Sequence, residues 1–358
     1  MKFYGREAEL ERLETRRRVA ENHCSQMTCV AGRRGVGKTS VILQSLQEEP
    51  NLYFYVCGTS ETILCRTFSE KVRREFGLFV PSGISEFAEL FELLLRYGKM
   101  RHYTLVLDDF QNFMQINPFV CARMQQIWER NKKETKVHLI LASTFGALNR
   151  KLSAETLLKS ADEQIELQPF TVSELKNLTA ESEPRSKEAD FDALMHLTGG
   201  VPSYVADLID HGALTLSSMA ARLLSPTAPY ILEGRELLRG EFGEGGYRFN
   251  AVLEAISSGA SKYAEIAEVS GVSNLSPYLD KLEKYGLIAK KHPPSAKPGT
   301  RKAIWYMQDP FLRFWYRYIL PNEGLLNAGE NQFVAAEDFP EYSEFSSPII
   351  DGRSGKSV

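Results

Sequence analysis

Short apolar runs alternate with helical patterns through residues 1–170 of the chain. The apolar runs that read as strands are Met27–Ala31, Leu52–Cys57, Tyr103–Asp108, Val137–Ala142 and Gln164–Leu167. The intervals between them carry helical patterns, for example Thr39–Gln47, Glu61–Phe76, Glu86–Tyr97 and Pro118–Asn131. Strands separated by helices favour a parallel sheet that is covered on both faces. The pattern therefore predicts an α/β fold for this part of the chain.

The pattern becomes helical after residue 170. Thr171–Glu174 reads T-V-S-E, a capping box that opens a helix, and helical periodicity continues to about Phe242. Gly243–Gly246 is interpreted as a linker to a compact segment with a helix–turn–helix rhythm. The last 38 residues hold seven acids and two bases with little periodicity, so we expect them to be mostly disordered. We therefore predict a core domain at 1–170, a helical lid at 171–242, a C-terminal domain at 247–320 and a tail at 321–358.

The nearly balanced overall charge limits the kinds of partner that the protein can attract by charge alone. The 358 residues contain 43 Lys plus Arg against 46 Asp plus Glu, so an affinity for nucleic acid or an anionic membrane has to be local. No apolar run approaches the ~20 residues of a membrane span, and the charged N-terminus lacks the apolar stretch of a signal peptide. The five cysteines form no C-x-x-C pair and the six histidines no H-E-x-x-H motif. We expect a cytoplasmic protein with no membrane partner, disulfide scaffold or structural zinc.

One segment matches the phosphate-binding pattern G-x-x-x-x-G-K-[ST] in full. Its residues are Gly32, Arg33, Arg34, Gly35, Val36, Gly37, Lys38 and Thr39, and Ser40 follows them. Glycines let the backbone wrap around phosphates with its N–H groups pointing inward. We expect Lys38 to reach the β- and γ-phosphates, Thr39 to ligate Mg²⁺, and the whole segment through Ser40 to bind the nucleotide.

Polar residues end two further predicted strands. The strand that begins at Thr104 ends in two carboxylates, and ending a buried strand in two acids is costly unless a cation or water meets them. Asp108 fits the metal-binding position, and Asp109 fits the residue that orients or deprotonates the attacking water. Ser143 at the end of the next strand is a candidate sensor of the γ-phosphate.

Taken together, these motifs resemble the archaeal-type ATPase family of P-loop proteins, related to the AAA+ and STAND classes, over residues 3–322. Four further stretches carry the resemblance: Phe3–Leu10 (F-Y-G-R-E-A-E-L), Leu107–Gln111 (L-D-D-F-Q), Thr198–Tyr204 (T-G-G-V-P-S-Y) and Asp309–Tyr316 (D-P-F-L-R-F-W-Y). The resemblance implies a P-loop NTPase parallel sheet with a helical lid, followed by a winged-helix domain. It also implies that ATP is the nucleotide, with Arg6 near the adenine and Pro202 packed on the base.

The chain departs from that family in three places. Asp109 stands where the family commonly has Glu, which predicts slow hydrolysis. Leu157–Ser160 replaces an arginine-bearing stretch, so no arginine finger is assigned, although Arg123 and Arg150 are available to a neighbouring subunit. Only 38 residues follow Leu320, too few for the nuclease-like domain of many members.

The C-terminal domain carries a local concentration of positive charge. We expect helices near 261–268 and Pro277–Tyr285, with Ser276 capping the second, and a flexible wing at Pro293–Thr300. Seven bases lie close together: Lys281, Lys284, Lys290, Lys291, Lys297, Arg301 and Lys302. A helix and a wing of this kind can bind duplex DNA through 261–302, or can simply hold a closed state of the protein.

An aromatic stripe follows the wing. Its members are Phe311, Phe314, Trp315 and Tyr318, at helical spacing on one face, and they are interpreted as core rather than as a base-stacking platform.

Three functional hypotheses remain open from the sequence. The leading one is a slow, Mg²⁺-dependent ATPase that works as a molecular switch, with ATP held between the sheet domain and the lid and the C-terminal module reading out the lid angle. The alternative is a DNA-binding regulator in which ATP is mainly a structural ligand. The third is an oligomeric machine that takes an arginine from a neighbour.

Overall fold

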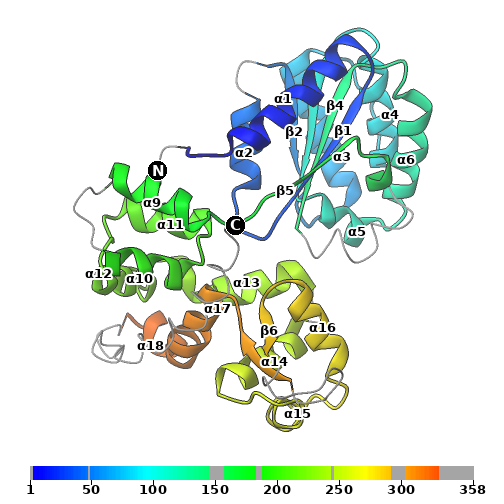
Figure 1. The fold of residues 1–358 in the computed structure, drawn as a ribbon. Helices are drawn as coiled ribbons and strands as arrows, with labels where there is room; N and C mark the ends of the chain where they lie inside the picture. The colour runs from blue at the N-terminus through cyan, green and yellow to red at the C-terminus, as the bar shows by residue number, and fades with distance from the viewer. Residues whose placement is uncertain are drawn as a thin grey trace. The chain divides into compact units, whose positions relative to one another are not determined.

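A computed structural model describes residues 3–46, 49–144, 157–182, 188–242, 246–291 and 303–329. The chain divides into two compact units, residues 3–168 and the residues from 169 onward (Figure 1). No helix of the described segments is both long enough and apolar enough to cross a membrane.

The first unit is built on a five-stranded parallel sheet, which confirms the predicted α/β core. Its strands are β1 (Gln26–Ala31), β2 (Asn51–Tyr55), β3 (Tyr103–Asp108), β4 (Val137–Ser143) and β5 (Glu163–Glu166). They lie in the order β2-β3-β4-β1-β5, and every neighbouring pair is parallel. Because parallel strands end at the same edge, residues that follow β1, β3 and β4 come together at one edge of the sheet.

Helices cover both faces of this sheet, as Figure 1 shows. They are α1 (Glu7–Asn22), α2 (Lys38–Ser45), α3 (Glu61–Phe76), α4 (Phe87–Tyr97), α5 (Phe113–Ile116) and α6 (Val120–Asn131), with short 3₁₀ turns at η1 (Phe110–Asn112) and η3 (Leu157–Ser160). Alternate residues of each central strand enter separate cores: in β4, Leu139 packs with α3, α4 and α6, while Ile140 packs with α1 and α2. This alternation explains why the strands are apolar throughout.

Helix α1 was not predicted from the sequence. Few of its side chains are buried, Leu13 and Ala20 being the two fully covered ones, and the rest of the helix is mostly charged. Arg–Glu pairs such as Arg17–Glu14 form along the helix, and Arg12 and Arg16 both contact Glu163, the first residue of β5. An apolar stripe this narrow leaves almost no helical periodicity to recognise.

A buried histidine links two central strands. His138 of β4 is 1% exposed, and its Nε2 lies 2.9 Å from Thr28 Oγ1 of β1. Burial lowers the pKa of His138 from its ordinary value of 6.5 to about 3. The folded protein therefore holds this ring in its neutral form at neutral pH.

We expect the protein to lose stability as the pH falls below about 6.5. The pKa of His138 is lower in the folded state, so the unfolded chain takes up this proton first, and the free energy of unfolding drops by about 2 kcal/mol between pH 7 and pH 5. Urea denaturation at each pH measures this, and His138→Gln should remove that part of the pH dependence. An unchanged slope in the variant would contradict the assignment.

The second unit begins with a helical segment. It contains α9 (Val172–Ser182), α10 (Glu188–Thr198), α11 (Pro202–Asp210), α12 (Leu216–Leu223) and α13 (Tyr230–Phe242). The predicted capping box at Thr171 is confirmed: Thr171 Oγ1 accepts a hydrogen bond from the Glu174 N–H at 3.3 Å, and the Glu174 carboxylate accepts one from the Thr171 N–H at 2.7 Å.

Three helices and an antiparallel strand pair follow. They are α14 (Gly246–Ser257), α15 (Tyr263–Ser270), α16 (Ser276–Lys284), β6 (Ile288–Lys291) and β7 (Ile304–Met307). Ser276 is not the cap that we expected, because α16 already begins there and its Oγ lies 3.5 Å from the Tyr263 hydroxyl. The expected wing, Pro293–Thr300, and residues 243–245 of the expected linker lie outside the described residues.

The aromatic stripe lies in the core of this unit, as predicted. It spans α17 (Pro310–Phe314) and a π-helical segment, η5 (Trp315–Ile319), and all four of its side chains are buried. Trp315 Nε1 donates to the backbone carbonyl of Tyr230 at 3.0 Å, and its ring packs so close to Gly234 that a Cβ there would lie 2.4 Å from it. Part of the expected tail is helical, since η6 (Leu320–Asn322) and α18 (Glu323–Asn327) follow, and 330–358 lie outside the described residues.

Candidate functional site

The glycine-rich segment forms a tight loop between β1 and α2. Gly35 and Gly37 have φ angles of 78° and 95°, in the left-handed region that favours glycine. A Cβ on Gly32 would lie 2.7 Å from Val36 Cγ1 and 2.9 Å from the Leu167 carbonyl oxygen. The loop therefore needs glycine at 35 and 37 for its backbone angles and at 32 for its packing.

The N-terminus of α2 follows the loop directly. Lys38, Thr39 and Ser40 form its first turn, where backbone N–H groups lack helical partners and the helix dipole favours an anion. The Lys38 side chain is buried, and its Nζ donates to the carbonyl oxygens of Gly32 at 3.0 Å and Arg33 at 3.1 Å. The ammonium group thus lies against the loop, where a polyphosphate would need a positive charge.

Arg6, which directly precedes α1, contacts the backbone of this loop. It has a φ of 73° and is 8% exposed. Its guanidinium donates to the carbonyl oxygens of Val36 at 3.5 Å and Gln168 at 2.5 Å, and it pairs with Glu9 at 3.2 Å. Arg6 therefore connects the start of α1 to the loop and to the chain that leaves β5. Its expected position near an adenine stays a prediction.

Asp108 at the end of β3 contacts Thr39, in the first turn of α2, although β4 lies between β3 and β1 in the sheet. The Thr39 hydroxyl donates to Asp108 Oδ2 at 2.6 Å, and the carboxylate is 2% exposed. The structure thus brings together the two residues expected to hold a metal. A hydroxyl and a carboxylate are hard oxygen ligands of the kind Mg²⁺ takes, so this pair fits that cation.

Asp109 and Ser143 are joined through a residue that the sequence analysis left without a role. Gln111 Nε2 donates to Asp109 Oδ1 at 3.1 Å, and the Ser143 hydroxyl donates to Gln111 Oε1 at 2.9 Å. Asp109 itself has a φ of 54°, a left-handed conformation that Asp adopts more readily than most residues. These two hydrogen bonds connect Asp109 through Gln111 to Ser143 at the end of β4.

Two tyrosines of β2 face the acid pair, and sequence analysis missed both. Strand β2 pairs with β3 so that Tyr55 lies opposite Asp108. The Tyr53 hydroxyl donates to Asp108 Oδ2 at 2.5 Å, so that oxygen accepts bonds from Thr39 and Tyr53 together. Burial and the neighbouring Asp108 raise the pKa of Tyr53, while burial and the charge of Asp109 raise the pKa of Tyr55. The alternation of residues along β2 could have indicated both tyrosines. Leu52 and Phe54 are buried, so Tyr53 and Tyr55 share the other face of the strand.

Pro202 lies in the second unit, as the first residue of α11. It follows Gly199 and Gly200, whose φ angles are 61° and 74°. A Cβ on Gly200 would lie 2.3 Å from the Phe170 carbonyl oxygen, so this turn requires glycine for close packing. The expected contact of Pro202 with a base stays a prediction.

Comparison with known proteins finds a family and several proteins that are similar to this chain. The model of a family described as an ATPase domain predominantly from Archaea matches residues 3–208. An uncharacterized protein of Methanocaldococcus jannaschii is 24% identical over 339 residues, which cover 91% of this chain and 71% of that protein. The Walker-type ATPase of Pyrococcus abyssi has a similar fold, with a TM-score of 0.61 at 18% identity over 88% of this chain and 96% of that one. Cdc6p of Pyrobaculum aerophilum aligns over 94% and 96% of the two chains at 17% identity, with a TM-score of 0.46.

Proposed function

Because the chain belongs to the family of ATPase domains found predominantly in Archaea, we propose that it is an Mg²⁺-dependent ATPase that works as a nucleotide-controlled switch. The observation that carries the proposal is the 2.6 Å hydrogen bond between Thr39 and Asp108. It joins the first turn of α2, which we propose binds phosphate, to the acidic end of β3.

Each residue of the site has a role in this proposal. The loop from Gly32 to Ser40 binds the phosphates, and Lys38 leaves its two backbone carbonyl partners to contact the β- and γ-phosphate oxygens. Thr39 and Asp108 would hold Mg²⁺, which would supply positive charge to neutralise the phosphates. Asp109 orients or deprotonates the attacking water, with Gln111 fixing its carboxylate. Ser143 responds to the γ-phosphate through Gln111.

The second unit is the output of the switch in this proposal. The helices α9–α13 act as the lid, and α14–α16 with β6 and β7 act as a winged-helix module, whose element order supports that designation. Duplex DNA is the first partner to test, through residues 261–302, and a protein partner or a second copy of the chain is the other. Turnover is slow because Asp109 is one methylene shorter than the Glu common in the family.

A second candidate is a DNA-binding regulator in which ATP is mainly a structural ligand. The exposed lysines on α16 and β6 favour it, because Glu283 neutralises only one of them, Lys290, at 2.9 Å. Lys281, Lys284 and Lys291 form no ion pair within the described segments, which leaves positive charge for a phosphate backbone.

Steady-state ATP hydrolysis separates these functions. The full chain is assayed with Mg²⁺, with Mg²⁺ removed by EDTA, and with or without duplex DNA. Mg²⁺-dependent turnover that rises with DNA supports a DNA-coupled switch, and turnover indifferent to DNA supports a switch with a protein partner. Tight ATP binding without turnover under every condition contradicts the proposal and favours the structural-ligand alternative.

Removing the Tyr53 hydroxyl should weaken the metal site. Tyr53→Phe leaves Asp108 with one hydroxyl donor, Thr39, so the carboxylate is less well oriented, and we expect the Mg²⁺ concentration for half-maximal turnover to rise about tenfold. The same shift should appear in the Mg²⁺ dependence of thermal stabilisation by ADP. Tyr97→Phe is the matched control, because its hydroxyl donates to the backbone of Phe79. Equal Mg²⁺ dependence in both variants would remove Tyr53 from this role.

A further inference from the structure

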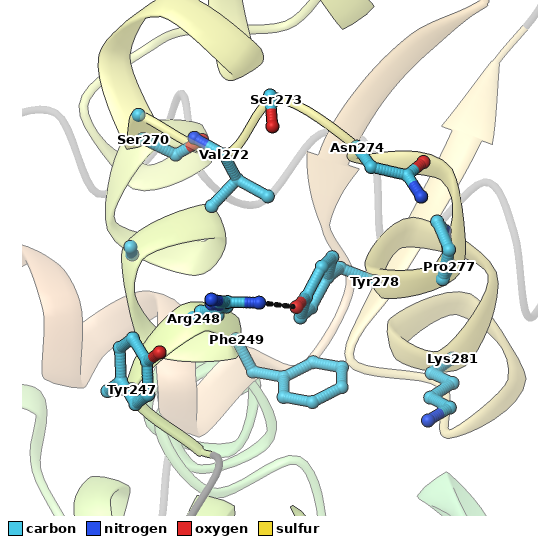
Figure 2. A pocket seen from close by; sticks show the side chains of 12 residues that line it. Tyr247, Arg248, Phe249, Ser270, Val272, Ser273, Asn274, Pro277, Tyr278 and Lys281 are labelled. Carbon is cyan, nitrogen blue, oxygen red and sulfur yellow. Dashed lines mark hydrogen bonds between the residues drawn. The ribbon is translucent and has the colours of Figure 1, made fainter.

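The second unit contains a cavity of its own, whereas the glycine-rich loop belongs to the first unit. The cavity has a volume of about 610 Å³ and is bounded by the first turn of α14, the turn after α15 and the start of α16 (Figure 2). That volume is far larger than one phosphate ion requires and falls within the ~300–1,000 Å³ of small-molecule sites.

Positive charge dominates the lining of this cavity. Arg248 and Lys281 are its charged residues, and no acid lines it within the described segments. Neither cation forms an ion pair with any described residue. Two acids of the neighbouring helices are paired elsewhere: Glu265 of α15 with Lys262, and Glu283 of α16 with Lys290. Arg248 reaches across from α14 to the hydroxyl of Tyr278 on α16 at 3.1 Å, as the dashed line in Figure 2 shows. A cavity with two cations and no acid favours an anionic ligand.

Aromatic rings also line this cavity. The Tyr247 ring is 67% exposed, and Phe249 and Tyr278 pack against each other with 4.9 Å between ring centroids. The two cations already lie near ring faces, Arg248 at 5.5 Å from the centre of Tyr247 and Lys281 at 5.8 Å from that of Phe249. Exposed tyrosine faces beside cations can stack a flat ring whose phosphate the cations neutralise.

We infer that this cavity binds a nucleotide unit, an unpaired base together with its phosphate, either free or within a single strand. The base stacks on Tyr247 while Arg248 and Lys281 contact the phosphate. Ser273 and Asn274, which lie on the turn after α15 in Figure 2, add polar side chains to the lining. This site goes beyond the proposed ATPase, because it uses the first turn of α14 and takes a second nucleotide that is not the hydrolysed one.

Binding is tested on the full chain with its phosphate-binding loop first saturated by Mg²⁺ and a non-hydrolysable ATP analogue. The probes are fluorescently labelled pentathymidylate, thymidine 5′-monophosphate and inorganic phosphate. Arg248→Gln and Tyr247→Ala both alter exposed side chains and should each weaken nucleotide binding about tenfold. Arg239→Gln is the matched control, because it removes an exposed arginine of α13 that does not line the cavity.

The probes also distinguish the two sources of the nucleotide. Binding of pentathymidylate that weakens in the two cavity variants and not in the control assigns the site to a single strand, and the same pattern with the monophosphate assigns it to a free nucleotide. Phosphate that binds as tightly as the nucleotides would overturn the inference, since the rings then contribute nothing. Equal weakening in Arg239→Gln, or no binding of any probe, would overturn it as well. ATP-analogue binding is measured separately, so a failure here leaves the ATPase proposal standing.

Discussion

Replacing Lys38 by Ala should lower the rate of ATP hydrolysis roughly 10²–10³-fold while the protein stays folded. The Lys38 ammonium group contacts two loop carbonyls, Gly32 at 3.0 Å and Arg33 at 3.1 Å, so it is already held beside the expected phosphate position. Removing one fixed positive group from developing phosphate charge costs roughly 10²–10³-fold in turnover. We also expect weaker ATP binding, because the same group contacts the ground-state phosphates. Steady-state phosphate release and nucleotide titration measure the two effects.

The control for this variant is Lys99→Ala. Lys99 is an exposed lysine of the same unit, paired with Glu134 far along the sequence from the loop, and its removal should leave turnover unchanged. Circular dichroism of both variants checks that the fold is retained. Turnover in Lys38→Ala that equals the wild-type rate would show that the hydrolysis does not come from this loop.

Asp109→Asn should lower turnover while ATP affinity holds. The carboxylate accepts a hydrogen bond from Gln111 and is placed to act as a base, whereas an amide cannot take a proton. General base catalysis contributes roughly 10²–10⁴-fold, so the loss should fall in that range. Asn adopts the left-handed conformation of residue 109 as readily as Asp does, so the backbone with φ of 54° should be preserved.

This variant also distinguishes the leading function from its alternative. If the protein is an ATPase and Asp109 is its base, turnover falls and the Kd for ATP does not change. Asp109→Glu, which restores a carboxylate, should keep measurable turnover and serves as the conservative control. A rate that is the same in wild type and Asp109→Asn would show that Asp109 has no catalytic role, and would favour a nucleotide that is bound as a structural ligand.

The features that could be predicted well from the sequence are those that depend on residues close to one another along the chain. The loop at Gly32–Thr39 needs particular residues at fixed spacing, because left-handed backbone and close packing leave no alternative to glycine. The central strands β1, β3 and β4 were recognisable because each is buried on both faces and is therefore mostly apolar. The position of Asp108 at a strand end followed from the same pattern. Helix α1 was missed because its buried stripe is too narrow to show.

Other features depend on residues that are distant in sequence and could not be predicted from it. Tyr53 contacts Asp108 because β2 pairs with β3 in one register, and a shift of one residue would turn that hydroxyl to the opposite face of the sheet. Arg6 meets Gln168 across 162 positions, and Gln111 meets Ser143 across 32.

The cavity beside Arg248 has the same kind of origin. Its walls come from α14, α15 and α16, and no local pattern marks Tyr247 or Arg248 as neighbours of Tyr278. Local sequence therefore determined the elements and the phosphate-binding loop, because backbone conformation and burial act over a few residues. The tertiary structure decided which side chains surround the acids and the cavity, because those contacts exist only after strands and helices have packed in one register.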